Sequence, residues 1–251
     1  MKEHLDFLKL IRIIEMNRLS FFTTHELASL INAESKSIQN YLETLANNKL
    51  LVRLEKGKYC RAYIKDPWII GSNIIQDGTI SYKSALAYHQ MIHADSSSVF
   101  VCSTHQKKNK TFQGTFFRFI KLSSHKCFGY YEEDNPDGTI RVSDEEKTLL
   151  DCFDQPGYAI EYPHLISLFE ERKTDSEKML HYGLKMQNLS VLKRLAYLSD
   201  VFNLPDYHKF RKSVAKLVNE KYTLLDPSGP DQGKFSSRWK IRDNMISISS
   251  V

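Results

Sequence analysis

Three short segments with helical spacing of apolar residues, followed by two β-prone runs, occupy the first 65 residues and restrict the fold most strongly. Apolar residues recur at three- and four-residue intervals over residues 3–16, and the segment 17–20 ends this pattern. Thr23 or Thr24 then offers an N-cap for a second helix, with Glu26 at the capping-box position if Thr23 is the cap. This order predicts two short helices ahead of a third.

The third segment supplies a candidate recognition helix. We expect Ser35 to cap a helix that reaches Asn47, after a second helix that ends near Asn32. Its buried stripe is apolar and consists of Ile38, Leu42 and Leu45. Two short helices across a short turn form a helix-turn-helix, whose second helix enters the major groove of DNA.

The polar residues left on the outside of this helix are candidate DNA contacts. They are Ser35, Lys36, Ser37, Gln39, Asn40 and Glu43. Gln39 and Asn40 can each form a bidentate pair with adenine, and Lys36 and the serines can hold phosphate at the helix N-terminus. The alternative interpretation is a face that is merely solvated.

A basic hairpin is predicted directly after the recognition helix. Two β-prone runs flank Lys56-Gly57-Lys58, and residues 49–65 contain six basic residues and one acid. A hairpin in this place is the wing of a winged helix-turn-helix, and its expected phosphate contacts are Arg53, Lys56, Lys58 and Arg61. Protein-interaction modules share this layout, so an interaction module without DNA specificity stays open.

The charge distribution agrees with a phosphate-binding module at the N-terminus. The chain has a net charge of +5, and residues 1–65 hold 11 Lys and Arg against 7 Asp and Glu, whereas the remainder holds 24 against 23. A local basic excess is the pattern expected of a nucleic-acid-binding surface. The excess is small, and it does not establish DNA binding without the motifs.

Composition excludes several other classes of protein. No apolar run approaches the roughly 20 residues of a membrane span, and the charged N-terminus does not resemble a secretory signal. The four cysteines are isolated, which argues against a zinc site or a disulfide framework and favours a reducing, cytoplasmic location.

The remainder of the chain, 66–251, is predicted to be a second, α+β domain, and Pro67 marks the boundary. A small, mostly antiparallel sheet is expected to precede a helical C-terminal portion. Its expected elements are a helix from Ser81 to His93, strands over 99–103 and 110–122 with a bulge at Gly114, a hairpin of 127–131 with 139–143, helices over 175–186, 190–202 and 207–219, and a terminal strand near 239–241.

Catalytic motifs and cofactor fingerprints are missing from the sequence. His89 and His93 would share a helix face, but no third ligand has a convincing spacing, so we expect no metal site. Asp137, Glu145 and Lys147 resemble the two acids and lysine of a Mg²⁺-dependent nuclease, which remains an alternative. We prefer a helix start there, with Ser143 or Asp144 as the N-cap. The basic turn 107–110 is either solvated or a second nucleic-acid or partner contact.

Five segments of the second domain, together with Gly57-Lys58-Tyr59, resemble AbiEi-type antitoxins, the regulator halves of type IV toxin–antitoxin pairs. The segments are Ile80-Ser81-Tyr82-Lys83-Ser84-Ala85-Leu86-Ala87-Tyr88-His89, Val99 to Thr104, Phe128-Gly129, Val142-Ser143-Asp144-Glu145-Glu146-Lys147-Thr148-Leu149-Leu150-Asp151, and Arg194-Leu195-Ala196-Tyr197-Leu198. Gln90-Met91 stands where the family tends to have Gly-Leu, and Ala196 where it tends to have Gly.

This resemblance implies a regulator and not an enzyme. It implies that the N-terminal module binds double-stranded DNA in the operator of the protein's own operon and represses it. It also implies that the second domain counters a partner toxin resembling a nucleotidyltransferase. No cofactor is implied.

Overall fold

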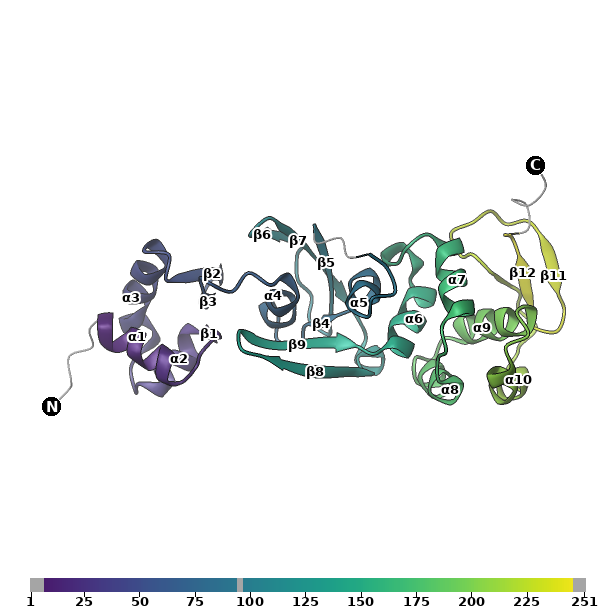
Figure 1. Cartoon of the computed structure of the whole chain (residues 1–251), viewed down its shortest axis with the longest axis horizontal. Helices are drawn as coiled ribbons and strands as arrows, with labels where there is room; N and C mark the ends of the chain where they lie inside the picture. Colours follow the sequence, from purple (N-terminus) through teal and green to yellow (C-terminus); the bar gives the residue numbers. More distant parts are fainter. Residues whose placement is uncertain (1–6, 94–96, 246–251) are drawn as a thin grey trace.

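The computed structural model describes residues 7–93 and 97–245, which form an elongated α+β molecule (Figure 1). An N-terminal unit of three helices and a small sheet lies at one end. A six-stranded sheet forms the middle, and a helical region with a second three-stranded sheet forms the other end. The mixed composition expected from the sequence is confirmed.

The N-terminal unit, residues 7–65, follows the predicted order with one addition. Its elements are α1 (Phe7–Met16), β1 (Phe21–Thr23), α2 (Thr24–Leu30), α3 (Ser35–Asn47), β2 (Leu51–Glu55) and β3 (Lys58–Arg61). The strands form an antiparallel sheet in the order β1-β3-β2. Strand β1 was not predicted, because three residues are too few to show an alternating pattern. Residues 3–6 of the expected first helix lie outside the described residues.

Capping explains where α2 begins. The Thr23 hydroxyl accepts a hydrogen bond from the Glu26 amide at 3.1 Å, and the Glu26 carboxylate accepts one from the Thr23 amide at 2.6 Å. This reciprocal pair is the capping box predicted from the sequence.

The middle of the molecule is a mixed sheet covered by two helices. Its elements are α4 (Pro67–Ile74), β4 (Thr79–Ile80), α5 (Tyr82–Tyr88), β5 (Ser98–Ser103), β6 (Lys110–Phe112), β7 (Thr115–Lys121), the short 3-10 helix η1 (Ser124–Lys126), β8 (Tyr130–Asn135) and β9 (Gly138–Ser143). The strand order is β6-β7-β5-β4-β9-β8, in which β5 pairs with β7 and β4 with β9 in parallel and the other pairs are antiparallel.

Two predictions for this region were wrong. The segment 110–122 is not one bulged strand, because Gln113 and Gly114 both have positive φ angles, 49° and 85°, and close a tight hairpin between β6 and β7. The helix that begins after Ser81 ends at Tyr88 and does not reach His93. The predicted hairpin of 127–131 with 139–143 forms, but its first strand begins at Tyr130 and continues to Asn135, which pairs with Gly138.

The C-terminal region is mostly helical, as predicted. Its elements are α6 (Glu145–Asp154), η2 (Pro156–Tyr158), α7 (Tyr162–Glu171), α8 (Ser176–Lys185), α9 (Leu189–Val201), η3 (Pro205–Tyr207), α10 (His208–Ala215), β10 (Thr223–Leu224), β11 (Lys234–Ser236) and β12 (Ile241–Asp243). The last three strands form a sheet in the order β10-β12-β11, where the sequence indicated only one terminal strand.

Two hydrophobic cores hold the parts of the molecule together. The largest lies between the six-stranded sheet and the C-terminal helices. A second core lies beneath α4 and includes Leu54, Cys60 and Ile64, which are contributed by the N-terminal unit. The N-terminal sheet therefore shares a core with the middle of the molecule across the expected boundary at residue 65. No helix among the described residues is long and apolar enough to cross a membrane.

Candidate nucleic-acid interface

Helix α3 presents one polar face to solvent. Ile38, Leu42 and Leu45 are buried in the core of the N-terminal unit, as predicted. The expected N-cap at Ser35 is wrong, because Glu34 has the extended conformation of a capping residue and Ser35 is already helical. The Glu34 side chain makes no capping hydrogen bond, and the Ser37 hydroxyl donates to the Glu34 carbonyl at 2.7 Å.

The predicted base-reading and phosphate-binding residues of α3 share this exposed face. Lys36, Ser37, Gln39 and Asn40 are exposed, and Ser35 is partly buried. The Gln39 amide donates to a carboxylate oxygen of Glu43 at 3.0 Å, one turn further along the helix. This bond leaves the Gln39 carbonyl oxygen facing solvent, so a neighbouring acid fixes the orientation of the amide. No carboxylate of the described residues forms an ion pair with Lys36.

The hairpin residues divide into outward-facing and inward-facing cations. Arg53 and Lys56 are exposed, and Arg53 makes only a long hydrogen bond, 3.4 Å, to the Glu55 carbonyl. Lys58 is half-buried, and this burial lowers its pKa although the nearby Glu55 carboxylate acts in the opposite direction. Arg61 is turned inward and donates hydrogen bonds to two main-chain carbonyls near the end of α1. The four cations expected at phosphate therefore do not form one surface.

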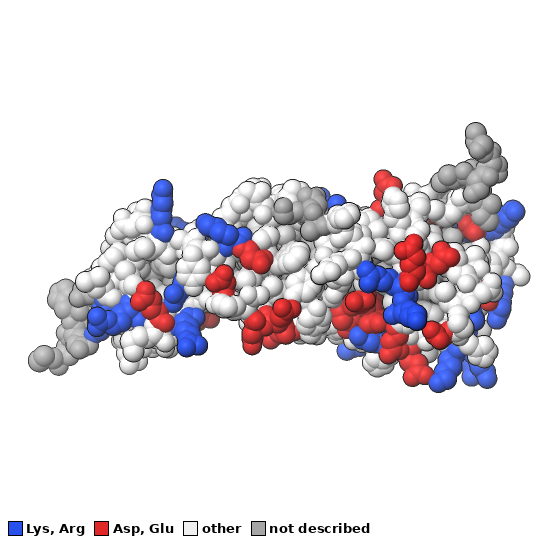
Figure 2. Space-filling model, in the orientation of Figure 1, with Lys and Arg blue, Asp and Glu red and all other residues white. Residues whose placement is uncertain are grey.

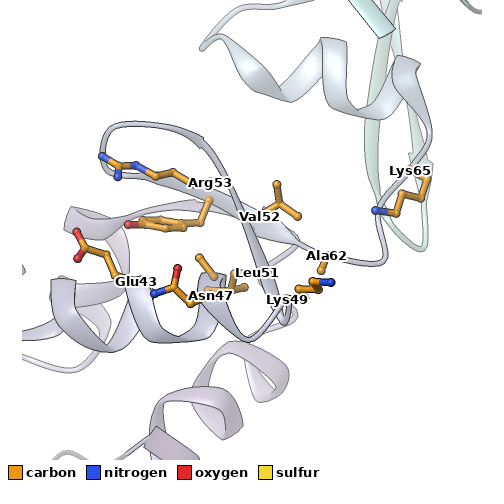
Figure 3. A pocket seen from close by; sticks show the side chains of 10 residues that line it. Glu43, Asn47, Lys49, Leu51, Val52, Arg53, Ala62 and Lys65 are labelled. Carbon is orange, nitrogen blue, oxygen red and sulfur yellow. The ribbon is translucent and has the colours of Figure 1, made fainter. Parts of the chain in front are cut away.

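A groove of about 680 Å³ lies between the C-terminal half of α3 and the outer side of the hairpin (Figure 3). Its charged lining residues are Glu43, Lys49, Arg53 and Lys65. Figure 3 shows Arg53 and Glu43 toward one end of the groove and Lys49 and Lys65 toward the other. Within the described chain, none of the three cations is ion-paired with an acid. Sequence reasoning did not single out Lys49 or Lys65, although both lie in the basic stretch 49–65.

The opposite side of the hairpin faces the six-stranded sheet. A cleft of about 800 Å³ lies there, lined by the hairpin residues Glu55 to Lys58 and by residues such as Ser72, His105 and Arg141. Lys107 forms an ion pair with Glu55, and the Lys110 ammonium donates to the Leu54 carbonyl. These two lysines of the basic turn 107–110 therefore secure the hairpin to the rest of the molecule.

The residues of the nuclease alternative are not brought together. Asp137 lies in the turn before β9, and Glu145 follows the other end of that strand. Asp144 caps α6 by accepting a hydrogen bond from the Lys147 amide at 2.9 Å, which confirms the helix-start interpretation. The Lys147 ammonium is buried against Asp151. No group of three or more metal-ligating side chains occurs in residues 7–93 and 97–245.

His89 and His93 do not share a helix face. Helix α5 ends at Tyr88, and His89 is its C-cap residue. The His89 Nε2 lies 2.7 Å from the Ser143 carbonyl, to which the ring donates a hydrogen bond. His89 thus has a structural hydrogen-bond partner.

Several segments that carry the resemblance to AbiEi-type antitoxins lie side by side. The Ser84 hydroxyl accepts a hydrogen bond from the Phe100 amide at 2.9 Å, and His89 bonds to Ser143. Ser143 in turn lies 3.0 Å from the hydroxyl of Thr148 on α6. The matched residues thus connect α5, β5, β9 and α6 in the core of the second domain.

The comparisons with known proteins show similarity in fold. No protein-family model and no curated protein matches the chain. Among solved structures, the chain is similar to the crystal structure of the RV2827C protein from Mycobacterium tuberculosis. The two are 13% identical with a TM-score of 0.55, over 92% of this chain and 89% of that chain. At this identity, the similarity concerns the arrangement of the elements alone.

Proposed function

We propose that the N-terminal unit is a winged helix-turn-helix that binds double-stranded DNA, with α3 as the recognition helix and β2–β3 as the wing. The observation that carries the proposal is the exposed polar face of α3, on which Lys36, Gln39 and Asn40 lie together without burial. In this type of domain, the N-terminal residues of the recognition helix meet base edges in the major groove.

The placement of cations around α3 supports this docking. Lys36 lies in the first turn of the helix, and Lys49, Arg53 and Lys65 line the surface groove beside its C-terminal half. Cations that could contact phosphates therefore lie on both sides of Gln39 and Asn40.

Each group then has a distinct role in binding. Gln39 and Asn40 pair with adenine edges, which gives sequence preference. Lys36, Arg53 and Lys56 hold phosphates, which gives affinity that falls with salt but no sequence preference. Glu43 orients the Gln39 amide and disfavours phosphate close to the middle of the helix.

We further propose that the chain is a cytoplasmic, autoregulating antitoxin of a type IV pair. Support comes from the resemblance of residues 80–89, 142–151 and 194–198 to AbiEi-type antitoxins. In this proposal the N-terminal unit represses the operon, and the second domain counters a toxin resembling a nucleotidyltransferase. Expression of the adjacent gene with and without this chain tests the pairing, and growth that is equal in both cases contradicts it.

The test of DNA binding is a titration of the full chain on the DNA upstream of its own gene, against scrambled DNA, at two salt concentrations. Preferential binding that weakens at higher salt supports the proposal. Equal affinity for both DNAs contradicts operator recognition. No binding contradicts the DNA-binding function itself and leaves the protein-interaction module.

A further inference from the structure

The C-terminal end of the molecule is as basic as the N-terminal unit. Residues 208–251 contain nine Lys and Arg and four Asp and Glu, whereas residues 66–207 contain 15 and 19. Figure 2 shows blue side chains along the edge of the molecule where β11 lies in Figure 1, and a group of red ones at the position of β8 in the middle. An acidic middle therefore separates two basic ends.

Two exposed aromatic rings meet on this C-terminal end. The ring centroids of Tyr222 and Phe235 are 4.9 Å apart with an interplanar angle of 82°, an edge-to-face pair. Tyr222 is 39% exposed and Phe235 is 60% exposed. Each ring directly follows a lysine, Lys221 or Lys234, and both lysines are exposed. Two Lys-aromatic dipeptides that are distant in sequence thus lie together.

The strand register explains why these residues share a face. In the central strand β12, Ile241 and Asp243 are buried, so Arg242 between them points to the other face. Phe235 pairs with Arg242, whose guanidinium lies 4.9 Å from the Phe235 centroid. Lys240 lies 5.5 Å from the Tyr222 centroid. The outer face of the sheet is therefore a platform of two rings and two cations.

The cations of the platform differ in how they are neutralised. Lys240 forms an ion pair with Glu220 at 2.6 Å, and Arg242 forms one with Asp231 at 2.6 Å. Lys221 and Lys234 have no acid within ion-pair distance in the described part of the chain. Lys240 and Arg242, which contact the rings, are thus neutralised by acids. Lys221 and Lys234 leave positive charge beside the rings.

We propose that the rings of this platform, Tyr222 and Phe235, together with the neighbouring Lys221 and Lys234, bind a single-stranded nucleic acid. Unpaired bases stack on exposed aromatic rings of a sheet, and neighbouring lysines hold the phosphates between them. Bases inside a duplex are already stacked and do not reach such rings. The platform lies on a different sheet from α3 and the wing, at the other end of the molecule, so this site is independent of the proposed duplex site (Figure 1).

The experiment measures binding of the full chain to fluorescein-labelled 12-nucleotide oligo(U) RNA and oligo(dU) DNA, which differ only in the sugar, by anisotropy at low salt. Phe235→Ala leaves the net charge unchanged and is expected to weaken binding about tenfold, because the stacking of one base is lost. Phe235→Trp should retain binding. Lys234→Ala should lower the slope of log affinity against log salt by about 0.7.

The matched control is Tyr130→Ala on the acidic strand β8. Tyr130 is 45% exposed and has the Arg141 guanidinium 5.2 Å from its ring centroid, so it resembles the platform rings in exposure and cation contact. Its loss should leave the affinity unchanged. Circular dichroism and thermal melting of each variant distinguish lost binding from lost folding.

Three outcomes would overturn the proposal: no binding to either oligonucleotide, binding that Phe235→Ala leaves unchanged, or a 12-base-pair duplex that binds as tightly and depends equally on Phe235. If both single-stranded oligonucleotides bind and their binding depends on Phe235, tighter binding of the RNA indicates that the site recognises RNA through its 2′-hydroxyls. Equal affinity assigns it to single strands of either sugar.

Discussion

Arg61 of β3 donates a hydrogen bond from Nη2 to the Ile14 carbonyl at 2.8 Å, and its Nε donates one to the Leu19 carbonyl at 3.0 Å. These bonds tie β3 to the end of α1. We expect Arg61→Ala to lower the free energy of unfolding by about 1–3 kcal/mol, because two partly buried carbonyls lose a charged donor. Urea denaturation measures this loss. A variant of unchanged stability with weaker DNA binding would instead return Arg61 to the phosphate-contact role.

The two lysines that flank Gly57 give a matched pair of variants. Both lysines line the cleft beside the six-stranded sheet, but Lys56 is exposed whereas Lys58 is half-buried. We expect Lys56→Ala to weaken binding to duplex DNA of any sequence and to lower the salt slope by about 0.9. Lys58→Ala should weaken binding and lower the salt slope less than Lys56→Ala does. Titrations at several salt concentrations measure both slopes, and a larger change for Lys58 would place the inner side of the hairpin on DNA.

Gln39 is the residue from which we expect sequence preference. Gln39→Ala should reduce discrimination between operator and scrambled DNA by about 1–3 kcal/mol, since one bidentate base contact is lost. Competition titrations with the two DNAs measure the ratio of affinities. An equal loss on both DNAs would show that Gln39 does not read a base.

The buried pair of Lys147 and Asp151 separates a structural role from the nuclease alternative. The two side chains are 2% and 3% exposed. Lys147→Ala would leave Asp151 buried without a counter-charge, at a cost of about 3–5 kcal/mol in unfolding free energy. Chemical denaturation measures this cost. A stable Lys147→Ala variant that loses Mg²⁺-dependent plasmid nicking would contradict the structural role.

Asp77 is expected to make stability depend on acid pH. Burial acts to raise its pKa, but hydrogen bonds from Ser103, Thr104 and His105 outweigh burial and hold the pKa well below the usual value. The native state then binds this proton less readily than the unfolded chain. The stabilisation is therefore present above the unfolded pKa of about 3.9 and is lost as the pH falls below it.

The test of Asp77 compares the wild-type chain with Asp77→Asn. The variant should be less stable at pH 7, and the difference between the two should shrink toward pH 3. Urea midpoints across this range measure it. A difference that is constant with pH would show that the charge of Asp77 does not contribute.

Local signals were sufficient for most elements of the N-terminal unit. The Thr23 capping box, the apolar stripe of α3 and the glycine of the hairpin each act over a few residues, so a single sequence shows them. The long-range arrangement was not accessible in this way. The inward turn of Arg61 depends on carbonyls more than 40 positions away.

In residues 66–245, local features could likewise be predicted, whereas contacts between distant segments could not. The β6–β7 hairpin was missed because Gln113 gives no turn signal, although its backbone has a positive φ. The aromatic platform was missed because Tyr222, just before β10, and Phe235 of β11 become neighbours only when β12 lies between these two strands. The helix start at Asp144 was predictable because its cap is local.

The core that Leu54, Cys60 and Ile64 share with α4 has a consequence for how this protein diversifies. The N-terminal unit cannot be exchanged independently of the rest of the chain. Replacing it would also replace Leu54, Cys60 and Ile64, which form one side of that core. Under the proposed DNA-binding role, operator preference is therefore expected to change through substitutions on the exposed face of α3 and not through exchange of the whole unit. A chimera joined at residue 65 is expected to fold only when these three apolar positions are carried over from the host chain.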